Sequence, residues 1–272
     1  GAHWQTLKSV NQSIVRSVHY TNNKLYVGMY MEFGYYQKDE FGSWQYTSLS
    51  ENIKSKLIED EQFWNILPLG TQLVFQSLDQ LIVHDPVKNT FQTLTHKKGI
   101  TGAWAPANSL YVQDSNKDLF LVEGGQWIKI AEASDLGNAL VVGMKKQQGL
   151  LTVVNEWGEF RAYNSGKWSM AWDTRLRTAH VYSAVVLADG GWAFIQVPST
   201  DGRGAWQDPT HVSFWNENCF WYYTRKNMAD FIRNKTVKFQ EFRLQTFWWE
   251  NNIAITDAWL VAVKSDKRRP HQ

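Results

Sequence analysis

Short runs of apolar residues, separated by glycines and charged turns, recur along the first two thirds of the chain. The stretch "LYVGMYMEFGYYQKDEFGSWQYTSL", residues 25–49, contains three such runs, around 25–29, 33–36 and 44–49. Each run is rich in aromatic or β-branched residues and ends at Gly, Asp, Lys or Glu, which are strand and turn signals. The pattern predicts two successive β-hairpins.

The same pattern starts again at Leu73, Leu110 and Leu150, and more weakly at Trp192. From Leu25 onward these starts are 48, 37, 40 and 42 residues apart, a period near forty. One further candidate strand precedes each start: "SIVRSVHY", "FWNILPL", "GITGAWA", "NALVVGM" and "YSAVVLA". Four short strands in roughly 40 residues are typical of a β-propeller blade. The sequence therefore predicts an all-β β-propeller of about five or six four-stranded blades, either closed within this chain or a fragment of a longer propeller.

Tryptophan is unusually frequent, with 15 in 272 residues. An aromatic residue recurs near the end of each repeat, at Trp44, Phe91, Trp127 and Trp168, followed by another apolar residue. Repetition at a fixed place favours a wedge between neighbouring blades over ligand contact.

The last quarter departs from the repeat, so we divide the chain into blades at 1–197 and a divergent β-rich segment at 198–272. We expect a bulge where the alternation around Val237 and Phe239 slips before Phe242 and Leu244. The aromatic runs "FWYY" (220–223) and "FWW" (247–249) favour a strand covered on both faces over a sugar-stacking platform.

Two further segments bear on closure of the ring. "HWQTL" at the start resembles the last strand of a blade whose first three strands are absent. "NNIAITDAWLVAVKS" near the end is a candidate for those missing strands. Pairing of the two segments would close the ring of blades and remove exposed sheet edges. Only "LSENIKSKLIEDEQFW", residues 49–64, has nearly helical spacing, and it predicts one short helix between blades.

Composition narrows the class of protein. The net charge of +2, with both signs interspersed, gives no basic field for nucleic acid, and the basic end "SDKRRPHQ" reads as a solvated terminus. No run reaches the roughly 18 apolar residues of a membrane span, and the single Cys219 excludes an internal disulfide. We expect a soluble piece that does not contact nucleic acid.

Three phrases carry a resemblance to a known family: "SIVRSVHYTNNKLYVGMYMEFGYY", "FWNILPLGTQLVFQSLDQLIVHD" and "SAVVLADGGWAF". Over about residues 3–195 the chain resembles the sensor propellers of Gram-negative bacterial regulators, of the two-component-regulator-propeller or triple-tyrosine type, found in hybrid histidine kinases and LuxR-class regulators. The resemblance implies a periplasmic or extracellular domain. It also implies an oligosaccharide or other small-molecule ligand, downstream signalling domains beyond this chain, and a homodimer as one possible assembly. Residues 199–272 depart from that family.

Motifs for catalysis or cofactors are missing from the sequence. It has no P-loop, dinucleotide fingerprint, zinc-protease or nucleophile-elbow motif, and we predict no cofactor and no catalytic residue. The dispersed histidines His3, His19, His84, His96, His180 and His211 disfavour a metal site. The pairs in "DE" (39–40) and "EDE" (59–61) read as solvated charge, although a propeller glycosidase can draw its two carboxylates from distant blades.

Ligand binding is the better-supported prediction, because propeller loops converge at one end of the fold and carry specificity. In "MYMEFGYY", Glu32 interrupts an apolar run between Tyr30 and Tyr35, and it requires a partner. An ion pair with Arg16 and contact with a ligand are equally supported. With Gln76 and Gln113 placed comparably in the next two blades, we expect a ring of polar side chains. The predicted ligand-binding residues are Arg16, Tyr30, Glu32, Tyr35, Gln76, Trp104 and Gln113.

The sequence thus predicts a ligand-binding propeller, and the family resemblance implies the role of a bacterial sensor with a carbohydrate-type ligand. Two alternatives stay open: a carbohydrate-active hydrolase or lyase, and a lectin-like propeller without a signalling role. A pair of carboxylates roughly 5 to 10 Å apart in an open pocket would favour the hydrolase.

Overall fold

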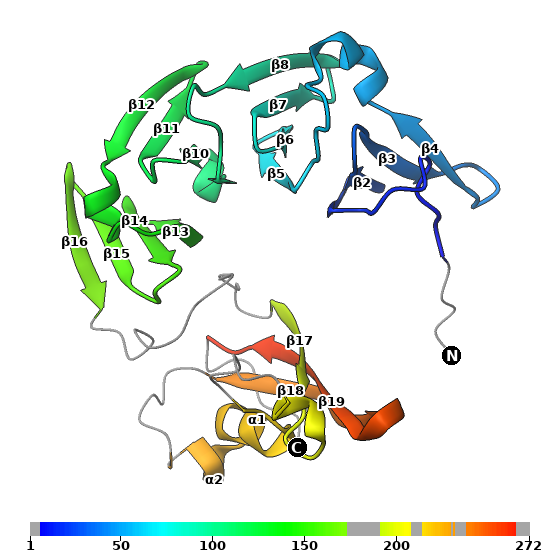
Figure 1. Cartoon of the computed structure of the whole chain (residues 1–272), viewed down its shortest axis with the longest axis vertical. Helices are drawn as coiled ribbons and strands as arrows, with labels where there is room; N and C mark the ends of the chain where they lie inside the picture. The colour runs from blue at the N-terminus through cyan, green and yellow to red at the C-terminus, as the bar shows by residue number, and fades with distance from the viewer. Residues whose placement is uncertain (1–5, 173–190, 208–213, 230, 232–237, 265–272) are drawn as a thin grey trace. The chain divides into compact units, whose positions relative to one another are not determined.

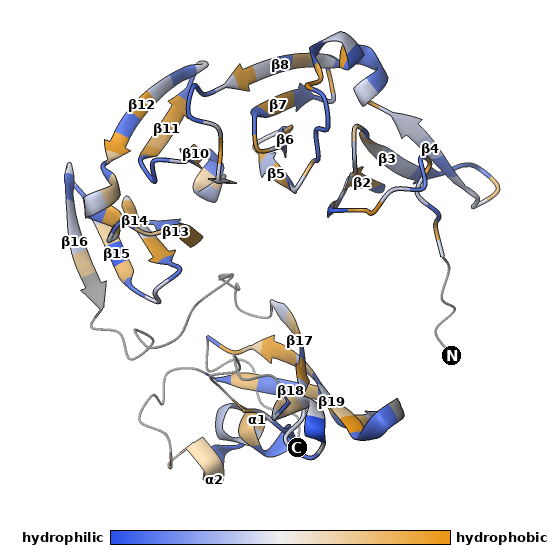
Figure 2. Ribbon diagram, viewed as in Figure 1, coloured by the Kyte–Doolittle hydropathy of each residue, from blue (hydrophilic) through white to orange (hydrophobic). Residues whose placement is uncertain are grey.

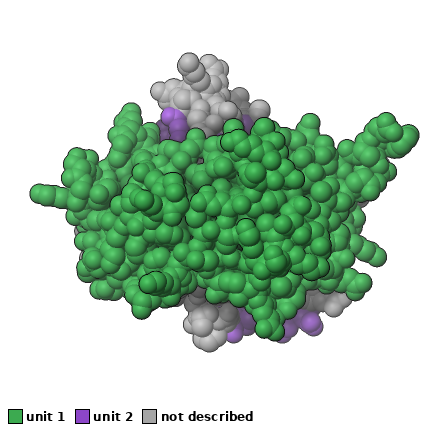
Figure 3. All heavy atoms as spheres, turned by 90° about the horizontal axis from the view of Figure 1, so that it is seen from above, with its two compact units in different colours: residues 1–184 green, residues 185–272 purple. Residues whose placement is uncertain are grey.

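The computed structural model describes residues 6–172, 191–207, 214–229, 231 and 238–264. The chain divides into two compact units, residues 1–184 (unit 1) and 185–272 (unit 2), which Figure 3 shows in different colours. The boundary lies before the last apolar repeat at Trp192, so that repeat belongs to unit 2.

Unit 1 contains four antiparallel sheets of four strands each, which follow one another along the chain (Figure 1). Blade 1 consists of β1 (Ser17–Thr21), β2 (Lys24–Gly28), β3 (Phe33–Lys38) and β4 (Trp44–Ser48). Blade 2 consists of β5 (Asn65–Leu69), β6 (Gln72–Gln76), β7 (Gln80–Asp85) and β8 (Thr90–Thr95). Blade 3 consists of β9 (Gly102–Trp104), β10 (Leu110–Gln113), β11 (Leu119–Glu123) and β12 (Gln126–Ala131). Blade 4 consists of β13 (Val141–Gln147), β14 (Leu150–Asn155), β15 (Phe160–Asn164) and β16 (Lys167–Trp172).

The four blades stack radially, as the repeat predicted. The first strands β1, β5, β9 and β13 contact one another in succession, whereas β8, β12 and β16 lie on the outer rim of the arc (Figure 1). Three apolar cores lie between adjacent blades, because the sides on which neighbouring sheets face each other are apolar. Figure 2 shows the apolar residues distributed along the strands of all four blades. The chain is therefore an all-β protein with a β-propeller fold, and that prediction is confirmed.

The recurrent aromatics pack as wedges. Phe91, Trp127 and Trp168 each contribute to the core that joins their blade to the one before. The Trp168 indole also donates its Nε1–H to the carbonyl of Ile130 in blade 3, at 2.7 Å. Trp44 packs at the corresponding place on blade 1, with Leu7 against the same cluster.

Short 3₁₀ helices occupy the connections. The predicted helix between blades is the 3₁₀ segment η1 (Ser50–Lys56), which is interrupted at Ile53; no described side chain caps its N-terminus. The others in unit 1 are η2 (Pro106–Asn108) and η3 (Ala133–Leu136). The candidate strand "YSAVVLA" and most of "HWQTL" lie outside the described residues.

Unit 2 contains a three-stranded antiparallel sheet in the order β17 (Trp192–Pro198), β19 (Ile253–Ala262), β18 (Phe239–Trp249). The expected bulge is present on β18, where the register shifts between Glu241 and Arg243. The strand predicted near the chain end is β19, which pairs with both other strands of this unit. Unit 2 also has η4 (Arg203–Ala205), η5 (Glu250–Asn252) and two α-helices, α1 (Glu217–Thr224) and α2 (Lys226–Ala229).

The helix α1 corrects the strand predicted for "FWYY". In the helix, Phe220 and Thr224 lie four residues apart on one buried face, and Arg225 covers the Trp221 ring at 3.9 Å. A run of four aromatics has no period of its own, so the strand prediction was wrong there. The "FWW" run does lie on β18, but its end is exposed rather than covered on both faces, with Trp248 and Trp249 more than half accessible.

Candidate binding site at the loop end of unit 1

The segments that precede β1 and β5 meet the loop that follows β2. Residues 29–31 and 61–63 are joined by backbone hydrogen bonds from Met31 to the Glu61 carbonyl (2.7 Å) and from Phe63 to the Met29 carbonyl (3.2 Å). Met31 has a φ of +54°, a backbone conformation that a side-chain-bearing residue rarely adopts and that is enriched at binding sites. This junction holds the loops of blades 1 and 2 together.

Five side chains gather at this junction, which we call the Arg16 cluster: Arg16, Tyr30, Asp60, Gln62 and Trp64. Arg16 donates from Nε to Oε1 of Gln62 at 2.9 Å, and its guanidinium carbon lies 4.6 Å from the centre of the Trp64 ring. The Tyr30 hydroxyl donates to Oδ1 of Asp60 at 2.5 Å. That hydrogen bond, together with the carboxylate charge, raises the pKa of Tyr30, so the phenol stays neutral at physiological pH.

The Arg16 cluster presents the groups that a polyhydroxyl ligand requires. Tyr30 and Trp64 are 41% and 42% exposed, so both rings offer apolar surface to solvent. The guanidinium retains N–H donors beyond the one bound to Gln62, and the carboxylate of Asp60 retains acceptor capacity. Aromatic surface with a few convergent polar groups is typical of small-molecule sites.

Glu32 and Arg16 have different partners. Oε1 of Glu32 accepts hydrogen bonds from the Tyr46 hydroxyl at 2.7 Å and from the Ser48 hydroxyl at 2.8 Å, both on β4. Burial, the bond to Glu32 and its charge raise the pKa of Tyr46. The structure thus uses Glu32 to tie the loop after β2 to the outer strand of the same blade.

The strand registers give Gln76 and Gln113 one equivalent place. They are the partners of Asn65 and Gly102 on the first strands of their blades, the place that Gly28 has in blade 1. Glu32 corresponds instead to Gln80, Asp118 and Glu159 in the other three blades. In each blade, the backbone carbonyl of this residue accepts the hydrogen bond that closes the turn between the second and third strands. The comparison of Gln76 with Glu32 was therefore out of register.

Gln113 is buried in the contact between blades 3 and 4. Its Nε2 donates to the carbonyls of Lys117 (3.1 Å) and Ala139 (3.0 Å), and its Oε1 accepts from the Val141 amide (2.8 Å). Gln76 is 4% exposed, and its backbone carbonyl accepts from the Trp64 amide.

Tyr35 and Trp104 also lie at blade contacts. The Tyr35 ring is 5.4 Å from that of Tyr26, and the Lys24 ammonium lies 4.0 Å from its centre. Burial raises the pKa of Tyr35, but hydrogen bonds with Thr47 and Lys24 outweigh it, so the net shift is downward. Trp104 packs against the core between blades 3 and 4.

Of the predicted binding residues, the structure brings Arg16 and Tyr30 together, and it adds Asp60, Gln62 and Trp64. Trp64 stands in the predicted strand "FWNILPL", but no local signal connects it to Arg16. The "EDE" run is not uniformly solvated: Glu61 is 2% exposed and accepts from Ser77 Oγ at 2.6 Å and Gln80 Nε2 at 2.8 Å.

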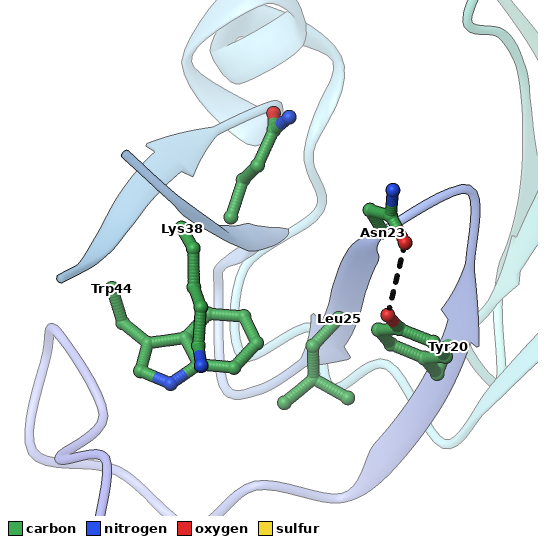
Figure 4. A pocket seen from close by; sticks show the side chains of 6 residues that line it. Tyr20, Asn23, Leu25, Lys38 and Trp44 are labelled. Carbon is green, nitrogen blue, oxygen red and sulfur yellow. Dashed lines mark hydrogen bonds between the residues drawn. The ribbon is translucent and has the colours of Figure 1, made fainter. Parts of the chain in front are cut away.

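A pocket of about 640 Å³ lies on the outer face of blade 1 (Figure 4), lined by Tyr20, Asn23, Leu25, Gln37, Lys38 and Trp44. The Lys38 ammonium lies 5.4 Å from the centre of the Trp44 ring. None of these lining residues is a carboxylate. In blades 2, 3 and 4 the equivalent face, with its aromatic wedge, is covered by the preceding blade. This pocket therefore lies on the face of blade 1 that corresponds to the blade-packing face of the other three blades.

Among the described residues, no three His, Cys, Asp or Glu side chains are grouped closely enough to hold a metal ion. The same residues include no helix with the length and hydrophobicity of a membrane span.

Comparison with known proteins gives only distant likenesses. No protein family matches the chain, and no curated protein does. Among solved structures, it is similar to the extracellular domain of the putative hybrid two-component system BT4673 from B. thetaiotaomicron, with a TM-score of 0.45 and 14% identity over 63% of this chain and 24% of that one. It is also similar to apo AztD from Citrobacter koseri, with a TM-score of 0.43 and 9% identity over 57% of this chain and 45% of that one. For BamB from Moraxella catarrhalis the TM-score is 0.40, with 12% identity over 58% and 49% of the two chains. The chain thus spans less than half the length of these structures.

Proposed function

We propose that the chain is the ligand-binding propeller of an extracytoplasmic bacterial sensor, and that the Arg16 cluster holds a carbohydrate-type ligand. The single observation that carries the proposal is the cluster itself: two half-exposed aromatic rings beside a guanidinium, an amide and a carboxylate. These groups combine stacking surface with fixed hydrogen-bonding partners for sugar hydroxyls.

The sensor role is supported by the sequence resemblance over about residues 3–195 to regulator propellers of the triple-tyrosine type. In this scheme the bound ligand changes blade packing or dimerisation, and a downstream signalling domain reads that change. A periplasmic or extracellular location belongs to the same proposal.

The first test measures binding and turnover together. Isothermal titration of the full chain against neutral tetrasaccharides (cellotetraose, xylotetraose, mannotetraose) is followed by chromatography of each binding mixture for shorter products. We expect binding without cleavage. Product formation would contradict the proposal in favour of the hydrolase or lyase.

The second test locates the site. Arg16→Ala and Tyr30→Ala should each weaken binding about tenfold, since each removes roughly 1 to 1.5 kcal/mol of stacking or charge-assisted hydrogen bonding. Arg225→Ala is the matched control, because it removes an arginine stacked on Trp221 in unit 2. If Tyr20→Ala weakens binding and Arg16→Ala does not, the ligand lies in the blade 1 pocket instead.

A further inference from the structure

Within the described residues, helix α1 covers one face of the unit 2 sheet, and the opposite face has exposed side chains on its outer strands β17 and β18. On the covered face, Phe220 of α1 packs against Ala258 and Leu260 of β19. On the other face, which we call the aromatic face, lie Trp192, Phe194, Gln196, Phe242, Arg243 and Asp257. Trp192, Phe194 and Phe242 are 55%, 50% and 63% exposed. Exposed aromatic surface of this extent marks an interaction site.

The strand registers arrange the aromatic face in two rows. Phe194, Trp259 and Arg243 are neighbours across the three strands, and Gln196, Asp257 and Gln245 form the next row. Successive side chains on one face of β17 are about 7 Å apart, so Trp192 and Phe194 offer two stacking positions in line.

Ring contacts hold these positions in place. Trp192 lies edge-on to Phe242, with centroids 4.8 Å apart, and Phe194 lies 4.4 Å from Trp259. Gln196 donates from Nε2 to Oδ1 of Asp257 at 2.9 Å, so the polar row is also fixed. Preformed rings and oriented polar groups lower the entropy cost of binding.

The polar row distinguishes this face from those between blades. The cores between blades of unit 1 consist of apolar side chains, largely aromatic between blades 1 and 2 and mainly aliphatic between the later blades. Covering the aromatic face with such a surface would remove the exposed Arg243 guanidinium and the exposed Gln196 amide from water, which is costly for each group. Asp257 is already only 8% exposed and is hydrogen-bonded to Gln196. A ligand with apolar C–H faces and many hydroxyls satisfies the rings and the polar row together.

We propose that the aromatic face is a second saccharide-binding surface, on which Trp192, Phe194 and Phe242 stack against sugar rings. Gln196 and Arg243 bind the sugar hydroxyls, and the buried Asp257 orients the Gln196 amide. The ligand class is a neutral oligosaccharide of at least two residues. This site does not require that the Arg16 cluster bind.

The test uses Trp192→Ala and Phe194→Ala in the full chain, titrated with cellotetraose, xylotetraose and mannotetraose. Each should weaken binding of the preferred tetrasaccharide about tenfold, because each removes one stacking position. Trp248→Ala is the matched control: Trp248 is 59% exposed on the same sheet, and by register its side chain belongs to the opposite face. Circular dichroism and the melting temperature of each variant establish that it is folded.

The outcomes separate this inference from the proposed function. A loss with Trp192→Ala but not with Arg16→Ala or Trp248→Ala supports the aromatic face and contradicts the Arg16 cluster. The reverse pattern overturns the aromatic face and leaves the cluster. Equal effects of Trp192→Ala and Trp248→Ala, or no binding of the three sugars at millimolar concentration, overturn the inference. A loss of self-association in sedimentation velocity on Trp192→Ala, without sugar binding, also overturns it by assigning the face to a protein contact.

Discussion

The side chain of Gln113 joins blade 3 to blade 4 by hydrogen bonds. Both ends of its amide are used, and all three partners are backbone groups between blade 3 and the first strand of blade 4. The sequence marked the residue as polar at a strand end, but it could not distinguish a blade clamp from a ligand contact. That distinction depends on residues 139 and 141, which come close only when the blades pack.

Gln113→Ala should destabilise the chain by about 3 kcal/mol, because it removes hydrogen bonds to three backbone groups, two of them buried. Gln76→Ala, at the equivalent place in blade 2, should cost less, since within the described residues its side chain makes no such clamp. Urea denaturation of both variants measures the difference. Equal losses of unfolding free energy in the two variants would show that the hydrogen bonds of the Gln113 side chain contribute little to stability.

His84 is a buried titratable group stacked on Phe91, with ring centroids 4.5 Å apart. Its Nδ1 has no hydrogen-bond partner among the residues that the structure describes. Burial lowers its pKa below the ordinary value of 6.5. As the pH falls below 6.5, the unfolded chain takes up this proton first, so the contribution of His84 to stability is present above that pH and is lost below it.

His84→Phe should therefore make the free energy of unfolding less dependent on pH between about 6.5 and 5, because phenylalanine keeps the stack and does not titrate. Urea denaturation of the wild type and the variant at pH 7.5 and 5.5 checks this. A pH dependence that is unchanged in the variant would contradict it.

At the scale of elements, the recurrent aromatic was the most informative signal in the sequence. It repeats because each blade needs a wedge at one place, and local spacing alone reveals it. The helix α1 escaped prediction for the opposite reason: its buried pair Phe220 and Thr224 is set by packing on β18 and β19. The Arg16 cluster was only half predicted, since Gln62 and Trp64 lie 46 and 48 residues from Arg16.

The wedge gives a matched pair of variants. Trp168→Ala should destabilise the chain by about 3 to 5 kcal/mol, because it opens a cavity between two blades and removes the hydrogen bond to Ile130. Trp44→Ala should cost about half as much or less, because that ring borders the blade 1 pocket. Thermal and urea denaturation compare the two variants, and an equal loss of unfolding free energy in both would contradict this prediction.

At the scale of the whole molecule, a repeat array transmits stability mainly between neighbours. Each core of unit 1 is shared by two adjacent blades. The period in the sequence predicted this arrangement. The organisation of unit 2, with helices beside a three-stranded sheet, depends on long-range packing, which a sequence repeat does not predict.

Trp168→Ala should therefore raise amide hydrogen exchange in blades 3 and 4 more than in blade 1. Gly28→Ala should raise amide hydrogen exchange in blade 1 more than in blades 3 and 4. The added methyl group would collide with Ser17 and Phe63 at the contact of blades 1 and 2. Exchange mass spectrometry resolves the blades. Uniform increases in both variants would show that unit 1 opens as one cooperative body.

The position of Cys219 on α1 has a practical consequence. It is the only thiol in the sequence and is partly accessible, and its helix covers the sheet face opposite Trp192 and Phe194. A maleimide fluorophore attached there labels the protein at one defined point without obstructing the aromatic face. The change in its fluorescence anisotropy on addition of a tetrasaccharide would report ligand binding independently of the fluorescence of the fifteen tryptophans.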